Sequence, residues 1–256
     1  MKYILLATLI FALSSCSHYY YSPNAHNVPL FKEKNEVRLN IAASTGDEFN
    51  GTELQAAYSA SNSVGIMANF ISAHGGELNS TGNYGEGTLA EAGIGYFTPL
   101  ADNFIFEVYG GGGYGKMNHR YETTYNPATG ANNTNGTAEM NMLRAFIQPN
   151  LGFATDYFDV AFSARMGLLH YSNITSANTV NISSDEQFNF NYINSHPTTY
   201  VVEPAITLRG GWKYIKVQTQ FVVVSRMNKN YPMNTFAVNL GMYMSFAPHF
   251  MKGNRK

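Results

Sequence analysis

The stretch FAVNLGMYMSF, residues 236–246, places an apolar side chain at every second position. The apolar set is Val238, Leu240, Met242, Met244 and Phe246, and it alternates with Asn239, Gly241 and Ser245. Successive side chains of a β-strand point to opposite faces of a sheet, so this pattern predicts a strand with one apolar and one polar face. Its length also suits a bilayer, which a tilted strand of about 9–11 residues crosses.

The same period of two recurs along the chain from residue 36 onward. In the first such segment Val37, Leu39 and Ile41 share one face, and Glu36, Arg38 and Asn40 share the other. We expect ten strands, near residues 36–44, 52–60, 64–74, 87–98, 104–118, 140–154, 159–172, 200–211, 215–226 and 236–246. Because every backbone polar group in lipid must be hydrogen-bonded, such strands are expected to close into a barrel.

The expected connections alternate in length. The turns at 61–63, 101–103, 155–157 and 213–214 are tight, whereas 119–139 and 173–198 are long and polar. This pattern, together with a last strand that ends in an aromatic residue, resembles that of small bacterial outer-membrane β-barrel proteins. The chain departs from their pattern in one respect, because residues 247–256 continue past the last strand. The resemblance implies an all-β, transmembrane, antiparallel up-and-down β-barrel of about ten strands, with eight as the alternative.

Composition bears on which face of the sheet is inside. Only 13% of residues are charged and 14% are aromatic. The polar faces carry mostly Gly, Ala, Ser and Asn, which suits a narrow lumen better than a soluble surface, where roughly 25–35% of residues are charged. The alternative is a lipid-tethered soluble barrel of the lipocalin kind, with its apolar face turned inward around a ligand. A net charge of −1 gives no indication of nucleic-acid binding.

Aromatic residues crowd the expected tight turns, where they predict a girdle at a membrane interface. They are Tyr96, Phe97, Phe104, Phe106, Phe153, Tyr157, Phe158, Trp212 and Tyr214.

The N-terminus has the pattern of a secretory signal, with Lys2 before an apolar stretch that runs from Tyr3 to Leu13. Leu13-Ser14-Ser15-Cys16 resembles the lipobox of bacterial lipoproteins, and the resemblance implies lipidation of Cys16, the only cysteine. We therefore expect a signal peptide over 1–15, a lipid-anchored periplasmic tether over 16–34 and the barrel over 35–256. Outer-membrane lipid is the expected partner, and the expected location is the outer membrane of a Gram-negative cell.

Charged residues recur on the polar faces of the strands, four acidic and four basic. They are Arg38, Glu53, Glu91, Glu107, Arg144, Arg165, Glu203 and Arg209. A barrel of eight to ten strands has little spare interior, so we expect structural ion pairs in a filled lumen, with a narrow passive channel or proton path as the alternative.

Other motifs predict no cofactor and no metal. Gly110 to Gly115 formally match a GxGxxG pattern, but they lie within an expected strand, where bending or room for neighbouring side chains explains them better. The seven histidines show no paired spacing, so no metal site is expected.

We expect a structural or interaction role rather than catalysis. Phe188, Phe190 and Tyr192 in the long loop 173–198 are candidate contacts for an envelope protein, or a lid that packs on the barrel. The less favoured alternative is a protease at the outer rim, because ten-stranded outer-membrane proteases exist. Its candidate residues are Asp47, Glu48, His119, Asp185, Glu186 and His196.

Overall fold

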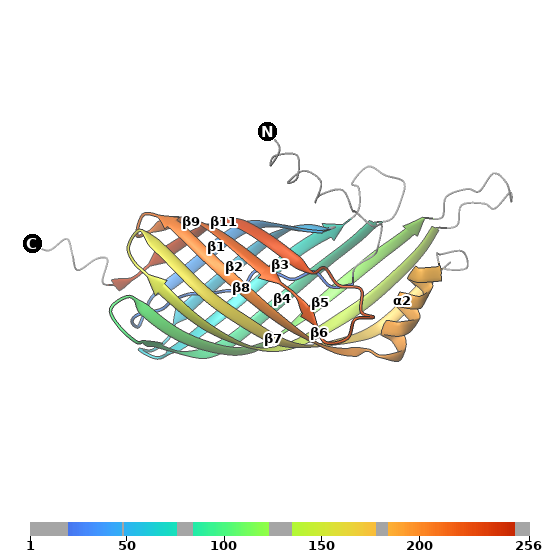
Figure 1. The fold of residues 1–256 in the computed structure, drawn as a ribbon, viewed down its shortest axis with the longest axis horizontal. Helices are drawn as coiled ribbons and strands as arrows, with labels where there is room; N and C mark the ends of the chain where they lie inside the picture. The colour runs from blue at the N-terminus through green and yellow to red at the C-terminus, as the bar shows by residue number, and fades with distance from the viewer. Residues whose placement is uncertain (1–19, 48, 76–83, 123–134, 178–183, 249–256) are drawn as a thin grey trace, which may run out of the picture.

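The structure is a computed structural model that describes residues 20–47, 49–75, 84–122, 135–177 and 184–248. It contains a closed antiparallel β-barrel, shown with its long axis horizontal in Figure 1. The strands are β1 (Val37–Gly46), β2 (Phe49–Ser59), β3 (Val64–Gly75), β4 (Tyr84–Pro99), β5 (Phe104–Glu122), β6 (Asn135–Ala154), β7 (Phe158–Ala177), β8 (Thr198–Gly211), β9 (Ile215–Val223), β10 (Ser225–Arg226) and β11 (Phe236–Phe246).

Each strand pairs with its neighbours in chain order, which is the up-and-down topology. β10 is a two-residue continuation of β9 beyond Val224 that also pairs with β8, so the two together form one barrel strand. Pairing of β1 with β11, from Val37 opposite Phe246 to Gly46 opposite Ala237, closes the ring. The predicted barrel of ten strands is confirmed, and the alternative of eight is wrong.

The apolar faces of the strands point outward. Leu240 is 60% exposed and Leu143 is 50% exposed, whereas the next residue in the chain, Arg144, is buried. This arrangement contradicts the lipocalin alternative, which needs the apolar face around an internal ligand. An outward apolar band over all strands is instead the surface that a bilayer covers.

The two ends of the barrel differ. At one end, here called the short-turn end, the strands are joined through residues 60–63, 100–103, 155–157 and 212–214. The opposite, long-loop end carries the other connections and α2 (Ser184–Ser195), which Figure 1 shows beyond the strands. The sequence patterns did not predict this helix. In the described part of the chain, no helix is long and apolar enough to cross a membrane.

Most of the predicted aromatic girdle lies on the outside near the short-turn end. Tyr157 and Trp212 are 67% and 73% exposed. Phe97 is an exception, because it is fully buried and its ring centroid lies 5.4 Å from that of Phe31 inside the barrel. Tyr96 and Phe97 are consecutive in β4, so they point to opposite faces, and only Tyr96 belongs to the girdle.

The lumen is occupied by the chain's own N-terminal part. Residues 20–34, here called the lumen segment, have no regular secondary structure, and from Tyr20 to Phe31 every residue but the half-buried Ser22 is buried. They contact inward-facing side chains of strands on all sides of the ring. Over its described part, the segment expected to be a lipid-anchored periplasmic tether, 16–34, therefore lies inside the barrel. Many backbone groups of these residues are hydrogen-bonded by inward-facing side chains of the strands.

Candidate functional site

Four of the predicted lumen charges meet in the middle of the barrel. Arg144 Nη2 lies 2.5 Å from Glu203 Oε2, and its Nη1 lies 3.2 Å from Glu91 Oε1. Arg165 Nε donates to the same Glu203 oxygen at 2.7 Å, and its Nη1 lies 3.6 Å from Glu91 Oε2. All four side chains are fully buried. Two carboxylates and two guanidinium groups give a balanced cluster, as a buried charge group requires. We call it the central cluster.

The glycine run in β5 makes space for this cluster. Gly113 stands directly between Glu91 of β4 and Arg144 of β6 in the sheet register. A Cβ atom at Gly113 would lie 2.7 Å from Glu91 Cγ. Because Gly113 has no side chain, Glu91 and Arg144 can approach across β5. Room for neighbouring side chains is thus the role of this glycine, as the sequence indicated.

Asn24 of the lumen segment joins the central cluster. Its Oδ1 accepts hydrogen bonds from Arg144 Nη1 at 2.9 Å and from Arg165 Nη2 at 2.8 Å, and its Nδ2 donates to Glu91 Oε2 at 2.8 Å. The Tyr21 hydroxyl donates to Glu203. One neutral amide therefore contacts three of the four charged groups, using its acceptor for the cations and its donor for an anion.

The backbone of the lumen segment is held by polar side chains of the strands. The amide of Ala25 donates to the Glu53 carboxylate, at 2.9 Å to Oε2. Gln220 accepts from the His26 amide at 2.6 Å and donates to the His26 carbonyl at 3.0 Å. Three more side chains donate to carbonyl groups of the lumen segment: Gln55 to Ala25, Gln148 to Asn27 and Arg209 to Val28. These buried backbone groups thus find partners without a sheet or helix.

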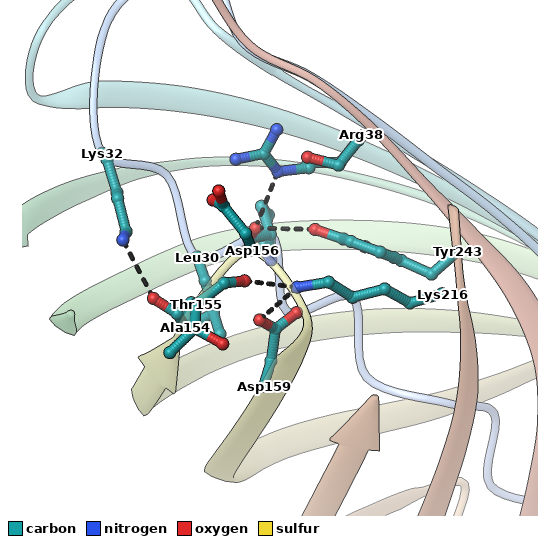
Figure 2. Close-up of a pocket in the computed structure, with 11 residues that line it drawn as sticks. Leu30, Lys32, Arg38, Ala154, Thr155, Asp156, Asp159, Lys216 and Tyr243 are labelled. Carbon is teal, nitrogen blue, oxygen red and sulfur yellow. Dashed lines mark hydrogen bonds and ion pairs between the residues drawn. The ribbon is translucent and has the colours of Figure 1, made fainter. Parts of the chain in front are cut away.

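A second group of charges lies at the short-turn end, where Figure 2 shows the pocket around it. Lys216 Nζ is 2.6 Å from Asp159 Oδ1 and donates to the Thr155 carbonyl at 2.6 Å. Arg209 Nη1 lies 3.7 Å from Asp159 Oδ2. Arg38 pairs with Glu36 and donates through Nε to the Pro29 carbonyl at 3.1 Å, so this group also holds the lumen segment.

The structure places all eight predicted lumen charges inside the barrel, but not in one network. Glu91, Arg144, Arg165 and Glu203 form the central cluster. Glu53 and Glu107 instead bind backbone amides, of Ala25 and of Phe31 at 2.9 Å, and Arg38 and Arg209 belong to the short-turn end.

Sequence reasoning left out Glu36, Asp159 and Lys216 as partners of these charges. Asp159 shares its parity with Ser163 and Arg165, and Lys216 shares its parity with Gln218 and Gln220. That alternation was the available signal for both residues.

The three candidate contact residues of the loop 173–198 all lie in α2, and they face different surroundings. Phe188 is 57% exposed. Tyr192 packs against the barrel mouth, with its ring 5.6 Å from that of Tyr231 and its hydroxyl accepting from Asn228 Nδ2 at 2.5 Å. Phe190 is half-buried. Phe188 is therefore the candidate that faces outward, and Tyr192 has the lid-like position.

The residues of the rim-protease alternative do not form a described cluster. Asp47 accepts from Thr235, His119 is buried beside Tyr20, and His196 stacks on Tyr192. Cys16 and Glu48 lie outside the described residues, and the side chains of Asp185 and Glu186 are not described either. Within the described ranges no group of His, Cys, Asp and Glu has the arrangement of a metal site.

A closed ring of antiparallel strands, apolar outside and polar inside, defines the architecture of outer-membrane β-barrels. The chain is similar to the translocator domain of the autotransporter NalP from Neisseria meningitidis, with a TM-score of 0.50, 10% identity, and coverage of 87% of this chain and 90% of that one. This similarity shows the fold alone.

Two further solved structures resemble the chain more weakly. An outer-membrane channel from Pseudomonas putida F1 has a TM-score of 0.43 at 10% identity, covering 88% of this chain and 100% of that one. The outer-membrane protease OmpT from Escherichia coli has a TM-score of 0.43 at 6% identity, covering 84% and 94%. No protein-family model and no curated sequence matches the chain.

Proposed function

We propose that the protein is an outer-membrane β-barrel lipoprotein with a filled lumen, and that it acts structurally or by binding a partner through the long-loop end. The outward apolar band supports the membrane location, and the lipobox-like Leu13-Ser14-Ser15-Cys16 supports lipidation. The proposal rests chiefly on the lumen segment. Its buried backbone and the balanced central cluster fill the space through which a passive channel would conduct.

A structural role fits the chemistry of the lumen. The buried charges are bound to one another, to amides or to backbone groups. Such an interior stabilises a fixed shape. The outward-facing Phe188 on α2 is the residue we propose for contact with an envelope partner, because exposed aromatic side chains are frequent at binding hot spots.

Membrane extraction tests the proposal. Wild type and a Cys16→Ala variant with a conventional signal-cleavage site are expressed, and the outer membranes are washed with alkaline carbonate and with urea. We expect both proteins to stay in the membrane, because the barrel itself spans it. Loss of the variant with retention of wild type would show that lipid is the only anchor and would overturn the membrane barrel. Incorporation of an alkyne-labelled fatty acid into wild type and not into the variant tests lipidation separately.

A further inference from the structure

The lumen segment runs the whole way from one end of the barrel to the other. At the long-loop end, the Tyr20 amide donates to the Pro232 carbonyl at 3.0 Å, and the Asn234 amide donates to the Tyr21 carbonyl at 2.9 Å. Pro232 and Asn234 belong to the long connection between β10 and β11. At the other end, Lys32 Nζ donates to Asn103 Oδ1 at 3.1 Å and to the Ala154 carbonyl at 2.9 Å, next to two short turns.

The chain reverses its direction at the short-turn end before it enters β1. The Asn35 amide donates to the Ser59 carbonyl at 2.9 Å, beside the turn that joins β2 to β3. Asn35 has a φ of 65°, the left-handed conformation that asparagine tolerates better than most residues. Tyr20 therefore lies at the opposite end of the barrel from Val37, the first residue of β1.

Chain length then limits where the preceding residues can be. Three residues lie between Cys16 and Tyr20, and the four extended steps from one Cα atom to the next span at most about 14 Å. The hydrocarbon core of a bilayer is roughly 30 Å thick. Since Tyr20 is fixed at the long-loop end, Cys16 cannot reach the membrane surface at the short-turn end.

We propose that the lumen segment carries the N-terminus of the mature protein to the cell surface, so that acyl chains on Cys16 insert into the outer leaflet of the outer membrane. This inference rests on the proposed function, in which Cys16 is lipidated, and on the usual orientation of outer-membrane barrels, whose short turns face the periplasm. It reverses the periplasmic anchor expected from the sequence. The lipid partner is the outer leaflet beside the long-loop end.

Cleavage on intact cells tests the inference. A recognition site for a sequence-specific protease is inserted between Ser17 and His18 of the full chain, and the cells are labelled with the alkyne fatty acid. One matched control carries the same site after Asn132, in a long connection, and another carries it after Asp102, in a short turn. The fatty-acid label on the barrel band and the size of that band are measured before and after protease treatment, with and without permeabilisation.

We expect the barrel with the N-terminal site to lose at least nine-tenths of its label on intact cells, and the Asn132 control to be cut there as well. The Asp102 control should be cut only after permeabilisation. If the N-terminal site is cut only after permeabilisation while the Asn132 site is cut on intact cells, the inference is wrong and the proposed barrel stands. If intact cells protect the Asn132 site too, the proposed orientation fails and the inference fails with it. Absence of label from an otherwise cleavable protein removes the outer-leaflet anchor.

Discussion

Arg165 joins both carboxylates of the central cluster to the backbone of the lumen segment. It contacts Glu203 and Glu91, and its Nη2 also donates to the carbonyl of Asn24 at 3.0 Å. We expect Arg165→Ala to destabilise the barrel by about 3–5 kcal/mol, because the cluster would keep an uncompensated buried carboxylate. The measurement is the temperature at which the folded band disappears on a gel.

The control for this variant restores the charge balance. In a double variant, Arg165→Met with Glu91→Gln, Arg144 and Glu203 remain as one pair. We expect the double variant to recover part of the lost heat resistance, since neighbouring changes of this kind are not additive. An unchanged melting temperature in Arg165→Ala would contradict the role of the central cluster in stability.

A substitution at Gly113 tests whether the central cluster needs the space that this glycine leaves. A methyl group there would collide with Glu91 Cγ, so we expect Gly113→Ala to cost about 1–3 kcal/mol, the usual penalty of overpacking. The matched control is Gly110→Ala in the same strand, where the nearest atom to a new Cβ is the Phe146 carbonyl oxygen at 3.9 Å. Urea unfolding of both variants measures the difference. Equal midpoints would show that the cluster adjusts freely.

Sequence parity placed single residues well when they belong to strands. It predicted that Arg144 faces inward, and in the structure Arg144 is buried while its neighbour Leu143 is half exposed on the outside. It did not say which charges pair, because Glu91 and Arg165 are far apart in sequence and meet only across the lumen. It also treated Tyr96 and Phe97 together as girdle residues, although alternation requires them to separate.

At the scale of the strand, the outward face of β6 meets lipid in the proposed orientation. Ile147 of β6 is 48% exposed and lies opposite Gly110 of β5 and Met166 of β7, in the middle of the outward apolar band. We expect Ile147→Arg to destabilise the barrel in lipid vesicles by about 2–4 kcal/mol, because a lipid-facing cation near the bilayer midplane has this cost. Urea titration of protein refolded into vesicles measures it.

The control is Asn118→Arg, at an exposed position of β5 toward the long-loop end. A cation there lies near the interface, where the cost falls to about 0–1 kcal/mol. If Ile147→Arg were no less stable than this control, the outward face would not be in hydrocarbon.

The elements were predictable to different degrees. All ten strands were found because each has a clear period of two. The helix α2, SDEQFNFNYINS, was missed because its apolar residues Phe188, Phe190 and Tyr192 follow a strand-like spacing rather than one helical face. Its position depends on packing at the barrel mouth, where Ile193 is fully buried and Tyr192 contacts Tyr231.

For the whole molecule, a filled lumen predicts little conduction. We expect wild-type protein in planar bilayers to give no stable conductance steps. Asn24→Leu removes the side-chain hydrogen bonds that hold the lumen segment to Glu91, Arg144 and Arg165. The ion pairs of the central cluster remain in this variant. We therefore expect this variant to show intermittent openings at least tenfold more often than wild type.

Asn118→Leu, an exposed change outside the lumen, serves as the control and should behave like wild type. Stable steps in wild type would instead favour the passive-channel alternative.

The lumen segment could not be predicted from local pattern. Residues 20–31 contain no charge and no period, and their burial depends on groups such as Glu53 and Gln220, which come from distant strands.

Closure of β1 on β11 around the lumen segment sets an order of assembly. The hydrogen-bonded ring of strands encloses the lumen segment, which belongs to the same chain. A chain end that carries acyl groups could not pass through a closed barrel whose lumen is filled with ion pairs. If Cys16 is lipidated as proposed, we expect the seam between the first and last strands, the most distant pairing in sequence, to close last, after the lumen segment is in place.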